Sequence, residues 1–420
     1  MHESFLHYIW KYRLLKNDLI TTDNQEVKII ATGNHNSDSG PDFLTSKVKI
    51  GNTLWAGNVE IHINTSDWVK HKHHKDKSYS NIILHVVYNN DKELPSPNNN
   101  IPTIEIKRNI SLDLYNIYID LINNKQWIPC ATLAGEIDYF IWEKWKERLT
   151  IERLERKSEE IATLLNYHNN SWETAFYISL AKNFGLKVNS VPFELLAKSL
   201  PLKYLAKHKN SLLQIEALLF GQAGFLNNDF EDGYPKALKM EYQHLKNKFS
   251  LTPINTELWK FLRLRPANFP TLRISQFARL IHTSQQLFSY ILEFSTANEL
   301  RSMFLVKASE YWNNHYTFDK ASEKKEKYLG DNAIDLIIIN TVAPYIFHYG
   351  QVKDNAFYKE KVPELLNSIP AENNNIIRKW NKIGIKTNSA FQSQALIELK
   401  KNYCTPKKCL SCPIGKQIIK

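Results

Sequence analysis

The hydrophobic pattern changes its period about a third of the way along this chain of 420 residues, and this change constrains the fold most. Before about Ile137, short apolar runs alternate with turn residues, and apolar and polar side chains often alternate within them, as in β-strands. Beyond Ile137 the period is close to 3.6, which is typical of amphipathic helices. The sequence therefore predicts the α+β class, with an N-terminal α/β domain followed by a larger all-helical domain.

Individual elements of the N-terminal part follow from the same pattern. Phe5, Ile9 and Tyr12 recur at helical spacing and predict an opening helix. Gly51-Asn52 suits a hairpin turn, because glycine tolerates a positive φ at the first central position. Strands are expected at residues 27–30, 44–50, 54–64, 82–88 and 101–106.

The helical part is expected to begin with a long, charge-rich helix over residues 140–165. Ser171 predicts the N-cap of the next helix, and Gly185 predicts its C-terminal end. Pro270 is suited to the first position of a later helix. We expect three parts along the chain: an α/β domain at 1–130, a helical domain at 131–401 and a cysteine-bearing tail at 402–420.

The chain carries a formal net charge of +11 at pH 7, which favours an anionic partner. Its basic residues lie among 20 tyrosines and 10 tryptophans, a mixture suited to phosphate contact and base stacking, although an ordinary aromatic core has the same composition. The longest apolar stretch, residues 336–347, is interrupted by polar residues and is too short to cross a bilayer. We therefore expect a soluble cytoplasmic protein whose partner is nucleic acid, with DNA favoured over RNA.

Two acidic residues stand at corresponding places on neighbouring strands. Asp42 lies in Gly40-Pro41-Asp42-Phe43, at the start of one strand, and Glu60 lies within the next, in Val59-Glu60-Ile61-His62. Because side chains alternate along a strand, Glu60 and His62 share a polar face, while the intervening valine and isoleucine face the core. The hairpin between the strands is expected to bring Asp42 close to Glu60.

Two carboxylates with a water shell suit Mg²⁺ or Mn²⁺, which prefer oxygen ligands. Such a cation would polarise a scissile phosphate and lower the pKa of the attacking water. Asp42, Glu60 and His62 are then the expected catalytic residues, and His62 or a nearby lysine would orient the water. The alternative is structural: Asp42 caps a turn, and Glu60 is a solvated strand residue.

This arrangement resembles the PD-(D/E)XK nuclease superfamily over roughly residues 1–110. The resemblance implies a restriction-endonuclease-like core, with a helix and three strands followed by a second helix and a strand. It also implies that Asp42 is the first acidic residue of the motif and that Glu60 with His62 replaces its Glu-x-Lys. Glu3 corresponds to the glutamate that some members carry in the opening helix.

The departure from this pattern is the histidine at the lysine position. Imidazole carries a positive charge only near or below its pKa of ~6.5, so His62 is not equivalent to lysine at neutral pH. Lys47 or Lys49 on the neighbouring strand is the candidate to replace it.

A histidine-rich segment follows the second acidic strand. His71, His74 and Asp76 are expected to line the same cleft as Glu60, where histidine and carboxylate together would suit Zn²⁺ or Mn²⁺. An imidazole there could also act as general base. The alternative is a solvent-exposed basic loop. His73 is expected to belong to such a loop, and His85 to be a core residue.

The chain has four cysteines, and three of them lie close together near its C-terminus. Cys404, Cys409 and Cys412 have the spacing C-x4-C-x2-C, which predicts metal or cluster ligation rather than a secreted disulfide framework. A tetrahedral Zn²⁺ or a [4Fe-4S] cluster needs a fourth ligand, and Cys130 is the remaining cysteine. The alternative is a group of reduced thiols.

This layout resembles the iron staple of AddAB-type helicase–nucleases, in which one distant cysteine joins a C-terminal trio. There the lone cysteine precedes the nuclease motifs, whereas Cys130 follows them. The Cys-Leu-Ser-Cys-Pro-Ile run also resembles the cluster loop of endonuclease III-like DNA glycosylases. The centre is expected to be structural rather than catalytic.

Basic residues of the helical part cluster around a proline-rich turn. Arg263, Arg265 and Arg273 flank Pro266-Ala267-Asn268-Phe269-Pro270. A helix N-terminus beside arginines can bind phosphate, so these residues are candidate nucleic-acid contacts. The alternative is ion pairing with nearby glutamates.

The chain also resembles a bacterial family of unknown function nearly end to end. The shared runs are Gly-Pro-Asp-Phe, Val-Glu-Ile-His, Ser-Asp-Trp, Leu-His-Val-Val and Arg-Leu-Arg-Pro-Ala-Asn-Phe-Pro. That family implies no activity. The sequence leaves three functions open: a metal-dependent DNA nuclease, a non-catalytic nucleic-acid-binding protein on a degenerate nuclease fold, and a metallohydrolase of small phosphorylated substrates.

Overall fold

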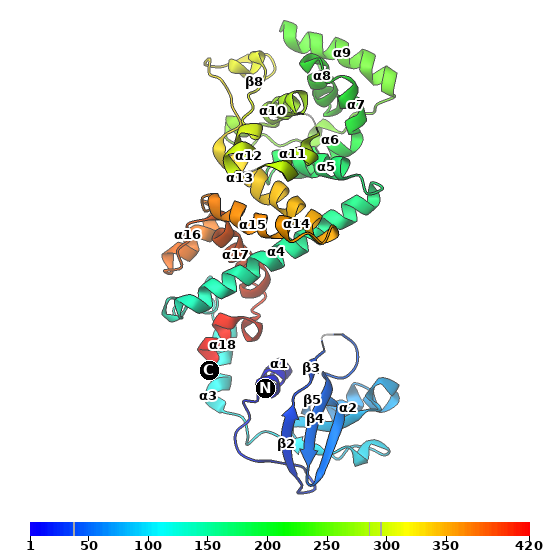
Figure 1. Cartoon of the computed structure of the whole chain (residues 1–420), viewed down its shortest axis with the longest axis vertical. Helices are drawn as coiled ribbons and strands as arrows, with labels where there is room; N and C mark the ends of the chain where they lie inside the picture. Colours follow the sequence, from blue (N-terminus) through cyan, green and yellow to red (C-terminus); the bar gives the residue numbers. More distant parts are fainter. Residues whose placement is uncertain (37, 285, 295) are drawn as a thin grey trace. The chain divides into compact units, whose positions relative to one another are not determined.

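The computed structural model describes residues 1–36, 38–284, 286–294 and 296–420, which divide into two compact units (Figure 1). One unit contains residues 1–142 together with 399–420, and the other contains residues 143–398. The α+β class is confirmed: a sheet-rich N-terminal region precedes a large helical region. The division differs from the expected one, because the cysteine tail belongs to the N-terminal unit and does not stand apart.

The N-terminal unit is built on a seven-stranded mixed sheet with strand order β1-β2-β4-β5-β6-β7. Neighbouring strands are antiparallel from β1 to β5, whereas β6 runs parallel to β5, and β7 parallel to β6. A short strand, β3, pairs with β4. The strands are β1 (Leu19–Ile20), β2 (Glu26–Ala31), β3 (Asn34–His35), β4 (Phe43–Ile50), β5 (Thr53–Asn64), β6 (Ile82–Asn89) and β7 (Thr103–Glu105).

The strands expected from the sequence all form, and the predicted hairpin joins β4 to β5. Gly51 adopts a positive φ of 55° in that turn, as expected. The predicted opening helix is α1 (Glu3–Lys11), which contacts β5. Its Trp10 ring packs against Phe43, whose cross-strand partner is Val59. Glu60 lies on the opposite face of β5, which does not pack against Trp10 and can carry polar side chains.

The crossover between β5 and β6 covers this polar face. It consists of α2 (Asp67–Lys70), η1 (His73–Lys75) and η2 (Lys77–Tyr79), and β6 follows directly. Trp68 is fully buried and forms a small apolar cluster with Tyr79, Ile82 and Leu94. As a result Glu60 and His62 are 4% and 1% exposed, so the polar face is enclosed rather than solvated.

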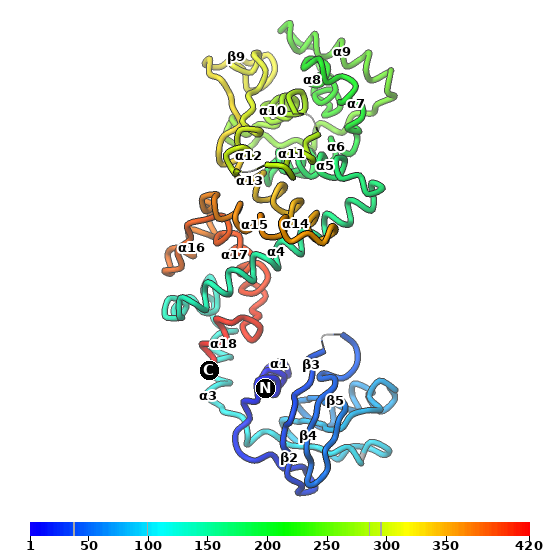
Figure 2. The backbone as a smooth tube through the Cα atoms, in the orientation of Figure 1, coloured from blue at the N-terminus to red at the C-terminus, as the bar shows by residue number. Residues whose placement is uncertain are grey.

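The remainder of the N-terminal unit combines segments from both ends of the chain. Helix α18 contacts α3, so the C-terminal helix lies beside a helix of the N-terminal segment (Figure 2). Lys416 of α18 donates a hydrogen bond to the Tyr12 hydroxyl, which lies just beyond α1. These elements are η3 (Asn98–Asn100), α3 (Leu112–Asn123), η4 (Ala134–Glu136), η9 (Lys400–Cys404), η10 (Cys409–Ser411) and α18 (Pro413–Ile419).

The second unit is helical apart from a two-stranded sheet of β8 (His315–Thr317) and β9 (Lys320–Ala321), which the all-helical expectation missed. The long charged helix is α4 (Tyr139–Tyr167). Ser171 caps the next helix by accepting a hydrogen bond from the Thr174 amide, and Pro270 occupies the first turn of α10, as expected.

Among the described residues, no helix is both long and apolar enough to cross a membrane. The further helices of this unit are α5 (Trp172–Phe184), α6 (Ser190–Ser199), α7 (Leu202–Lys207), α8 (Leu212–Gln222), α9 (Gly233–Phe249), η5 (Thr256–Leu258), η6 (Pro266–Asn268), α10 (Pro270–Thr283), α11 (Leu287–Glu293), α12 (Ala297–Phe304), η7 (Glu310–Asn313), α13 (Asp331–Ile337), η8 (Ile338–Val342), α14 (Ala343–Val352), α15 (Ala356–Ser368), α16 (Asn375–Lys382) and α17 (Ala390–Leu399).

Candidate metal-binding site

Asp42 and Glu60 lie together, as the predicted hairpin requires, and the backbone holds both carboxylates. The Asp42 amide donates a hydrogen bond to Glu60 Oε2 at 3.1 Å. The Ile61 amide donates to Asp42 Oδ2 at 2.9 Å. Each carboxylate therefore has one oxygen fixed by a backbone N–H. The second oxygen of Glu60 points to a different set of partners.

That oxygen, Glu60 Oε1, faces two imidazoles. It lies 3.5 Å from His62 Nε2 and 3.2 Å from His73 Nε2. His73 Nε2 is buried and faces the Glu60 carboxylate. Imidazole nitrogens and a carboxylate oxygen that face one another are suitable ligands for one cation.

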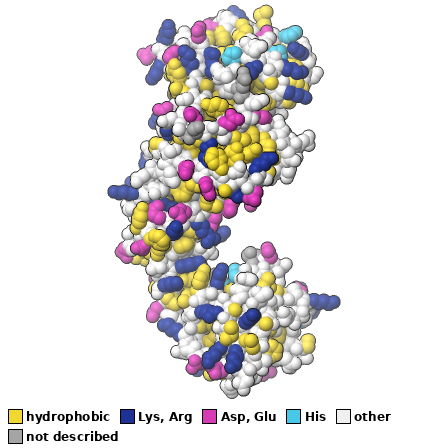
Figure 3. All heavy atoms as spheres, in the orientation of Figure 1, with side chains coloured by type: hydrophobic (Ala, Val, Ile, Leu, Met, Phe, Trp, Pro, Cys, Tyr) yellow, Lys and Arg dark blue, Asp and Glu magenta, His cyan; other side chains and the backbone are white. Residues whose placement is uncertain are grey.

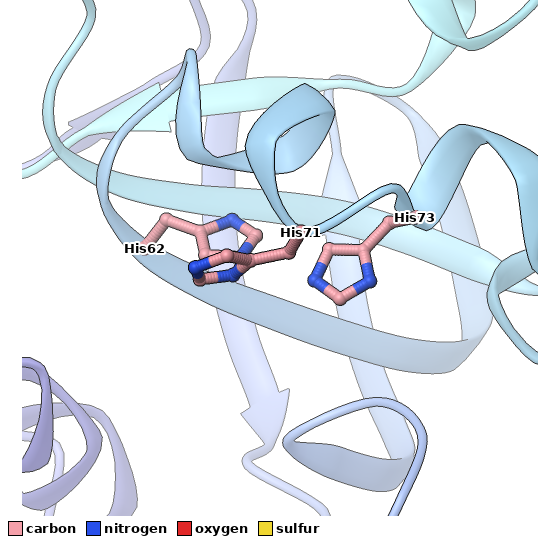
Figure 4. A group of neighbouring side chains, drawn as sticks. All are labelled: His62, His71 and His73. Carbon is pink, nitrogen blue, oxygen red and sulfur yellow. The ribbon is translucent and has the colours of Figure 1, made fainter.

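His71 completes the group. Its Nδ1 lies 3.3 Å from His62 Nε2, and the ligand nitrogens of His62, His71 and His73 all lie within 4.8 Å of one another. Figure 4 shows the three rings, from β5, the end of α2 and η1, directed into one space. His71 is exposed, so the site is open to solvent on that side.

Three contacts within this group have the length expected between neighbouring ligands of one cation. With metal–nitrogen bonds of about 2.0–2.1 Å, neighbouring ligands of a tetrahedral ion are roughly 3.3–3.4 Å apart. The contacts that Glu60 Oε1 makes with His62 and His73, and that His62 makes with His71, are 3.5, 3.2 and 3.3 Å. One carboxylate and three imidazoles suit Zn²⁺ or Mn²⁺ better than Mg²⁺, which prefers oxygen.

Burial sets the protonation of this group. Burial and the neighbouring histidines, His85 first, lower the pKa of His62 to about 2. Burial also lowers the pKa of His85 to about 3. Both imidazoles are therefore neutral at physiological pH, and a neutral imidazole has the free lone pair that metal binding requires. Burial raises the pKa of Glu60, which a bound cation would oppose.

Aromatic packing and one further histidine orient the ligands. The Tyr79 ring stacks on His73 with centroids 3.9 Å apart. Trp68 meets the rings of His62, His73 and His85 edge to face. His62 Nδ1 and His85 Nε2 are 2.9 Å apart. A His62 tautomer with its proton on Nδ1 would donate to His85 and leave Nε2 free for a cation, as supporting hydrogen bonds do in metal sites.

Asp42 meets a different histidine, on α1. His7 Nε2 lies 3.3 Å from Asp42 Oδ2, and both side chains are about one-fifth exposed. Burial alone would lower the pKa of His7, but the Asp42 carboxylate, together with Glu3 and Glu60, outweighs burial and raises it. Burial also raises the pKa of Glu3. The site therefore contains an Asp42–His7 pair beside the Glu60–histidine group.

The predicted residues are only partly brought together. His62 and His71 belong to one trio of histidines, and Glu60 contacts His62, whereas His74, which was expected there, lies outside the trio. His73, which was expected in an exposed loop, takes that place. His7 was not recognised from the sequence, and the only signal was its position one turn after Glu3 on the opening helix.

The candidate lysines do not fill the motif position. Lys47 pairs with Ala56, and Lys49 with Leu54, so they lie on the same face of the sheet as Glu60 but farther along it. Glu60 lies four positions beyond Ala56, a distance of roughly 13 Å along a strand. Both lysines are exposed. Neither lysine therefore stands beside Glu60.

The three candidate phosphate-binding arginines have different environments. Arg263 and Arg265 are exposed. Arg273 is only 5% exposed, and its guanidinium donates to Asn268 at 2.7 Å and to Gln276 at 3.3 Å. Helix α10 is buried along most of its length, so Arg273 does not present its charge on the surface.

The four cysteines line one pocket in the N-terminal unit, as the prediction of Cys130 as the fourth member of the group requires. They are Cys130, Cys404, Cys409 and Cys412. This pocket is a separate feature from the histidine group, since none of its lining residues belongs to the carboxylate strands.

Comparison with known proteins places the chain in a family but not in a functional class. The family model described as "Protein of unknown function (DUF2851)" matches residues 3–375 of the 420. No curated protein matches the chain, and no solved structure matches it either.

Proposed function

We propose that this chain, which belongs to the DUF2851 family, is a metal-dependent hydrolase of phosphodiester bonds in DNA. The observation that carries the proposal is the group of His62, His71 and His73, whose ring nitrogens lie within 4.8 Å of one another, together with Glu60 Oε1 at 3.5 Å from His62 and 3.2 Å from His73. The Asp42–His7 pair lies beside this group and supplies acid–base chemistry.

A cation held by Glu60 and the three histidines would polarise a phosphoryl oxygen and lower the pKa of a bound water. His7 holds a proton on Nε2 more readily than an isolated histidine, because Asp42 stabilises its charged form. We assign His7 the role of proton donor to the leaving oxygen. Asp42 orients His7 and keeps it charged, as a carboxylate does for a catalytic imidazole.

The order of elements supports the nuclease interpretation. Helix α1 precedes the antiparallel strands β2, β4 and β5, and a crossover leads to the parallel strand β6. This is the order that the PD-(D/E)XK resemblance implies, with Asp42 just before β4 and Glu60 within β5. The lysine of that motif is missing, and a cation bound by imidazoles would supply positive charge at the same end of the strand.

The net charge of +11 supports an anionic macromolecule as substrate. Arg263 and Arg265 remain candidate backbone contacts, whereas Arg273 does not. On the face drawn in Figure 3, lysine and arginine side chains are spread among acidic ones. Such a distribution suits several weak contacts along a nucleic-acid backbone better than tight binding at one patch. We place the activity in the cytoplasm, where thiols such as the four of this chain stay reduced.

The proposal is tested by cleavage assays on single- and double-stranded DNA and on RNA, with Mn²⁺, Zn²⁺ and Mg²⁺ supplied in turn. Cleavage with Mn²⁺ or Zn²⁺ is expected, and Glu60→Gln is expected to reduce it about 100-fold or more, because it weakens a metal ligand. Glu26→Gln is the matched control, since Glu26 lies on β2 of the same sheet and its side chain is 59% exposed. Equal cleavage by both variants would refute the proposed centre.

A metallohydrolase of small phosphorylated substrates is the second candidate, and the imidazole-rich ligand set favours it. A third, a non-catalytic DNA-binding protein, is favoured by the missing lysine. Hydrolysis of bis-p-nitrophenyl phosphate without DNA binding or cleavage would support the second candidate. Salt-dependent DNA binding with no hydrolysis under any of the three cations would support the third.

A further inference from the structure

Every cysteine of the chain lines the same pocket of the N-terminal unit. Cys130 comes from the segment after α3, and the other three come from the C-terminal tail, more than 270 residues later in sequence. The pocket lining is completed by Pro129, Tyr403, Lys408 and Gly415. A chance meeting of all four cysteines from two distant segments is a poor explanation, because unreactive core thiols have no reason to gather.

The tail is folded tightly around its three cysteines. Cys404 ends the π-helical turn η9, Cys409 begins η10, and Cys412 is the N-cap of α18. A Cβ atom on Gly415 would lie 2.3 Å from the Cys409 carbonyl oxygen, so only glycine permits this approach. The backbone therefore holds the three cysteines in a compact loop.

Lysines of the tail hold it against the segment that carries Cys130. Lys400 Nζ donates to the Trp127 carbonyl oxygen at 2.9 Å. Lys407 Nζ donates to the carbonyl oxygens of Ile122 and Asn124, at the C-terminal end of α3, where a helix attracts positive charge. These hydrogen bonds hold the tail against the segment that precedes Cys130, and none of them involves a sulfur atom.

Cys130, Cys409 and Cys412 are buried, and Cys404 is partly buried. A metal bound by these four cysteines would take the place of their thiol protons.

We propose that Cys130, Cys404, Cys409 and Cys412 ligate a metal centre, a [4Fe-4S] cluster or a Zn²⁺ ion, that fastens residues 399–420 to the segment after α3. The spacing C-x4-C-x2-C with Pro413 after the last cysteine, and one cysteine from elsewhere, provides the four thiolates that either centre needs. The centre is structural, and it does not depend on the function of the histidine site.

The first experiment measures iron, zinc and acid-labile sulfide in the full-length chain purified without oxygen. Roughly four iron and four sulfide per chain, or one zinc, is expected, and the two results distinguish the cluster from the ion. Thiol titration measures the cysteines of this site and no others, because all four cysteines of the chain belong to it. The thiols are expected to be unreactive until a chelator and denaturant are added. A metal-free chain with four reactive thiols, or with disulfides, would overturn the proposal.

The second experiment compares two variants. Cys130→Ser is expected to lose most of the iron or zinc, whereas Ser411→Ala, at an exposed position between two of the cysteines, is expected to retain it. Full metal content in Cys130→Ser would show that this residue is not a ligand and would refute a centre that joins the two segments.

A third measurement remains decisive if Cys130→Ser does not fold. The wild-type chain is treated with a chelator, or with oxidant and chelator for a cluster, and then with trypsin. Cleavage after lysines of the tail, which include Lys401, Lys407 and Lys408, is expected to become at least tenfold faster while cleavage within residues 143–398 is unchanged. Unchanged cleavage of the tail after proven metal loss would refute the fastening role.

Discussion

His73 and His74 are neighbours in the sequence, yet only His73 belongs to the histidine trio. The reason is the 3₁₀ turn η1, in which successive side chains point about 120° apart. His73 faces Glu60 and stacks on Tyr79, whereas His74 has a buried Nδ1 without a hydrogen-bond partner. The sequence shows that histidines are frequent in this segment. Which of His73 and His74 joins the trio depends on the backbone conformation of η1.

This difference gives a prediction with an internal control. His73→Ala is expected to weaken Zn²⁺ or Mn²⁺ binding by about 100-fold or more, because it removes a ligand, and loss of merely supporting contacts already costs 10–100-fold. His74→Ala is expected to leave the affinity unchanged. Competition against a fluorescent chelator measures both. Equal loss in the two variants would show that the trio is not the binding group.

At the scale of elements, the crossover from β5 to β6 decides the character of the site. The expected polar face of β5 exists, but the crossover encloses it, so its carboxylate and histidine are buried rather than solvated. Trp68 contributes most to this enclosure, because it is fully buried and contacts three histidine rings. Alternation along a strand predicts which side chains share a face, but not what will cover it.

Trp68→Ala is expected to lower the free energy of unfolding of the N-terminal unit by about 3–5 kcal/mol, the usual cost of removing a large buried side chain. It is also expected to weaken metal binding, since the rings of His62 and His73 lose their packing. Val69→Ala is the control in the same short helix, because Val69 is 44% exposed. Urea unfolding followed by fluorescence and circular dichroism measures the stability of both variants. A similarly small loss of unfolding free energy in both would contradict the role of Trp68 in enclosing the site.

Gly185 is a confirmed helix end at which the tertiary structure adds a second reason for glycine. The sequence predicts it as the C-terminal end of a helix, and it does end α5, with a φ of −68° that other residues also adopt. Glycine is required because a Cβ atom there would lie 2.2 Å from the Asn189 carbonyl oxygen. Close packing between a helix end and the following segment does not show in the local sequence pattern.

At the scale of the whole molecule, the helical unit is an insertion into a unit made from both ends of the chain. The sequence suggested three consecutive parts. The change of hydrophobic period near Ile137 can be seen in the sequence, but the packing of residues 399–420 against the N-terminal unit cannot. Contacts between residues far apart in sequence leave no periodic signal. Only Cys130, the fourth cysteine, indicated contact between the tail and the N-terminal part.

The helical unit contains a buried carboxyl whose effect on stability depends on pH. Burial raises the pKa of Glu216, which is 1% exposed and accepts a 2.6 Å hydrogen bond from Ser275. Because the folded pKa lies above the unfolded value, Glu216 stabilises the unit most below the unfolded pKa. This contribution is lost as the pH rises through the folded pKa.

Glu216→Gln is therefore expected to flatten the decline in unfolding free energy of the helical unit as the pH rises above the unfolded pKa of about 4.3. Glu231→Gln, at an exposed position, is expected to keep the wild-type dependence. Denaturant unfolding at several pH values gives the slopes. A steeper decline in Glu216→Gln than in the wild type would show that the sign assigned to this carboxyl is wrong.

The sequence by itself determined the class of the fold, the strands and hairpin that bring Asp42 beside Glu60, and the group of four cysteines. These features follow from the hydrophobic period, the turn residues and the residue types, which are properties of the local sequence or of the composition. The tertiary structure decided which histidines meet Glu60, that Arg273 is buried, and that the tail joins the N-terminal unit. Those outcomes depend on how elements distant in sequence pack against one another, and packing of that kind is fixed only when the whole chain has folded.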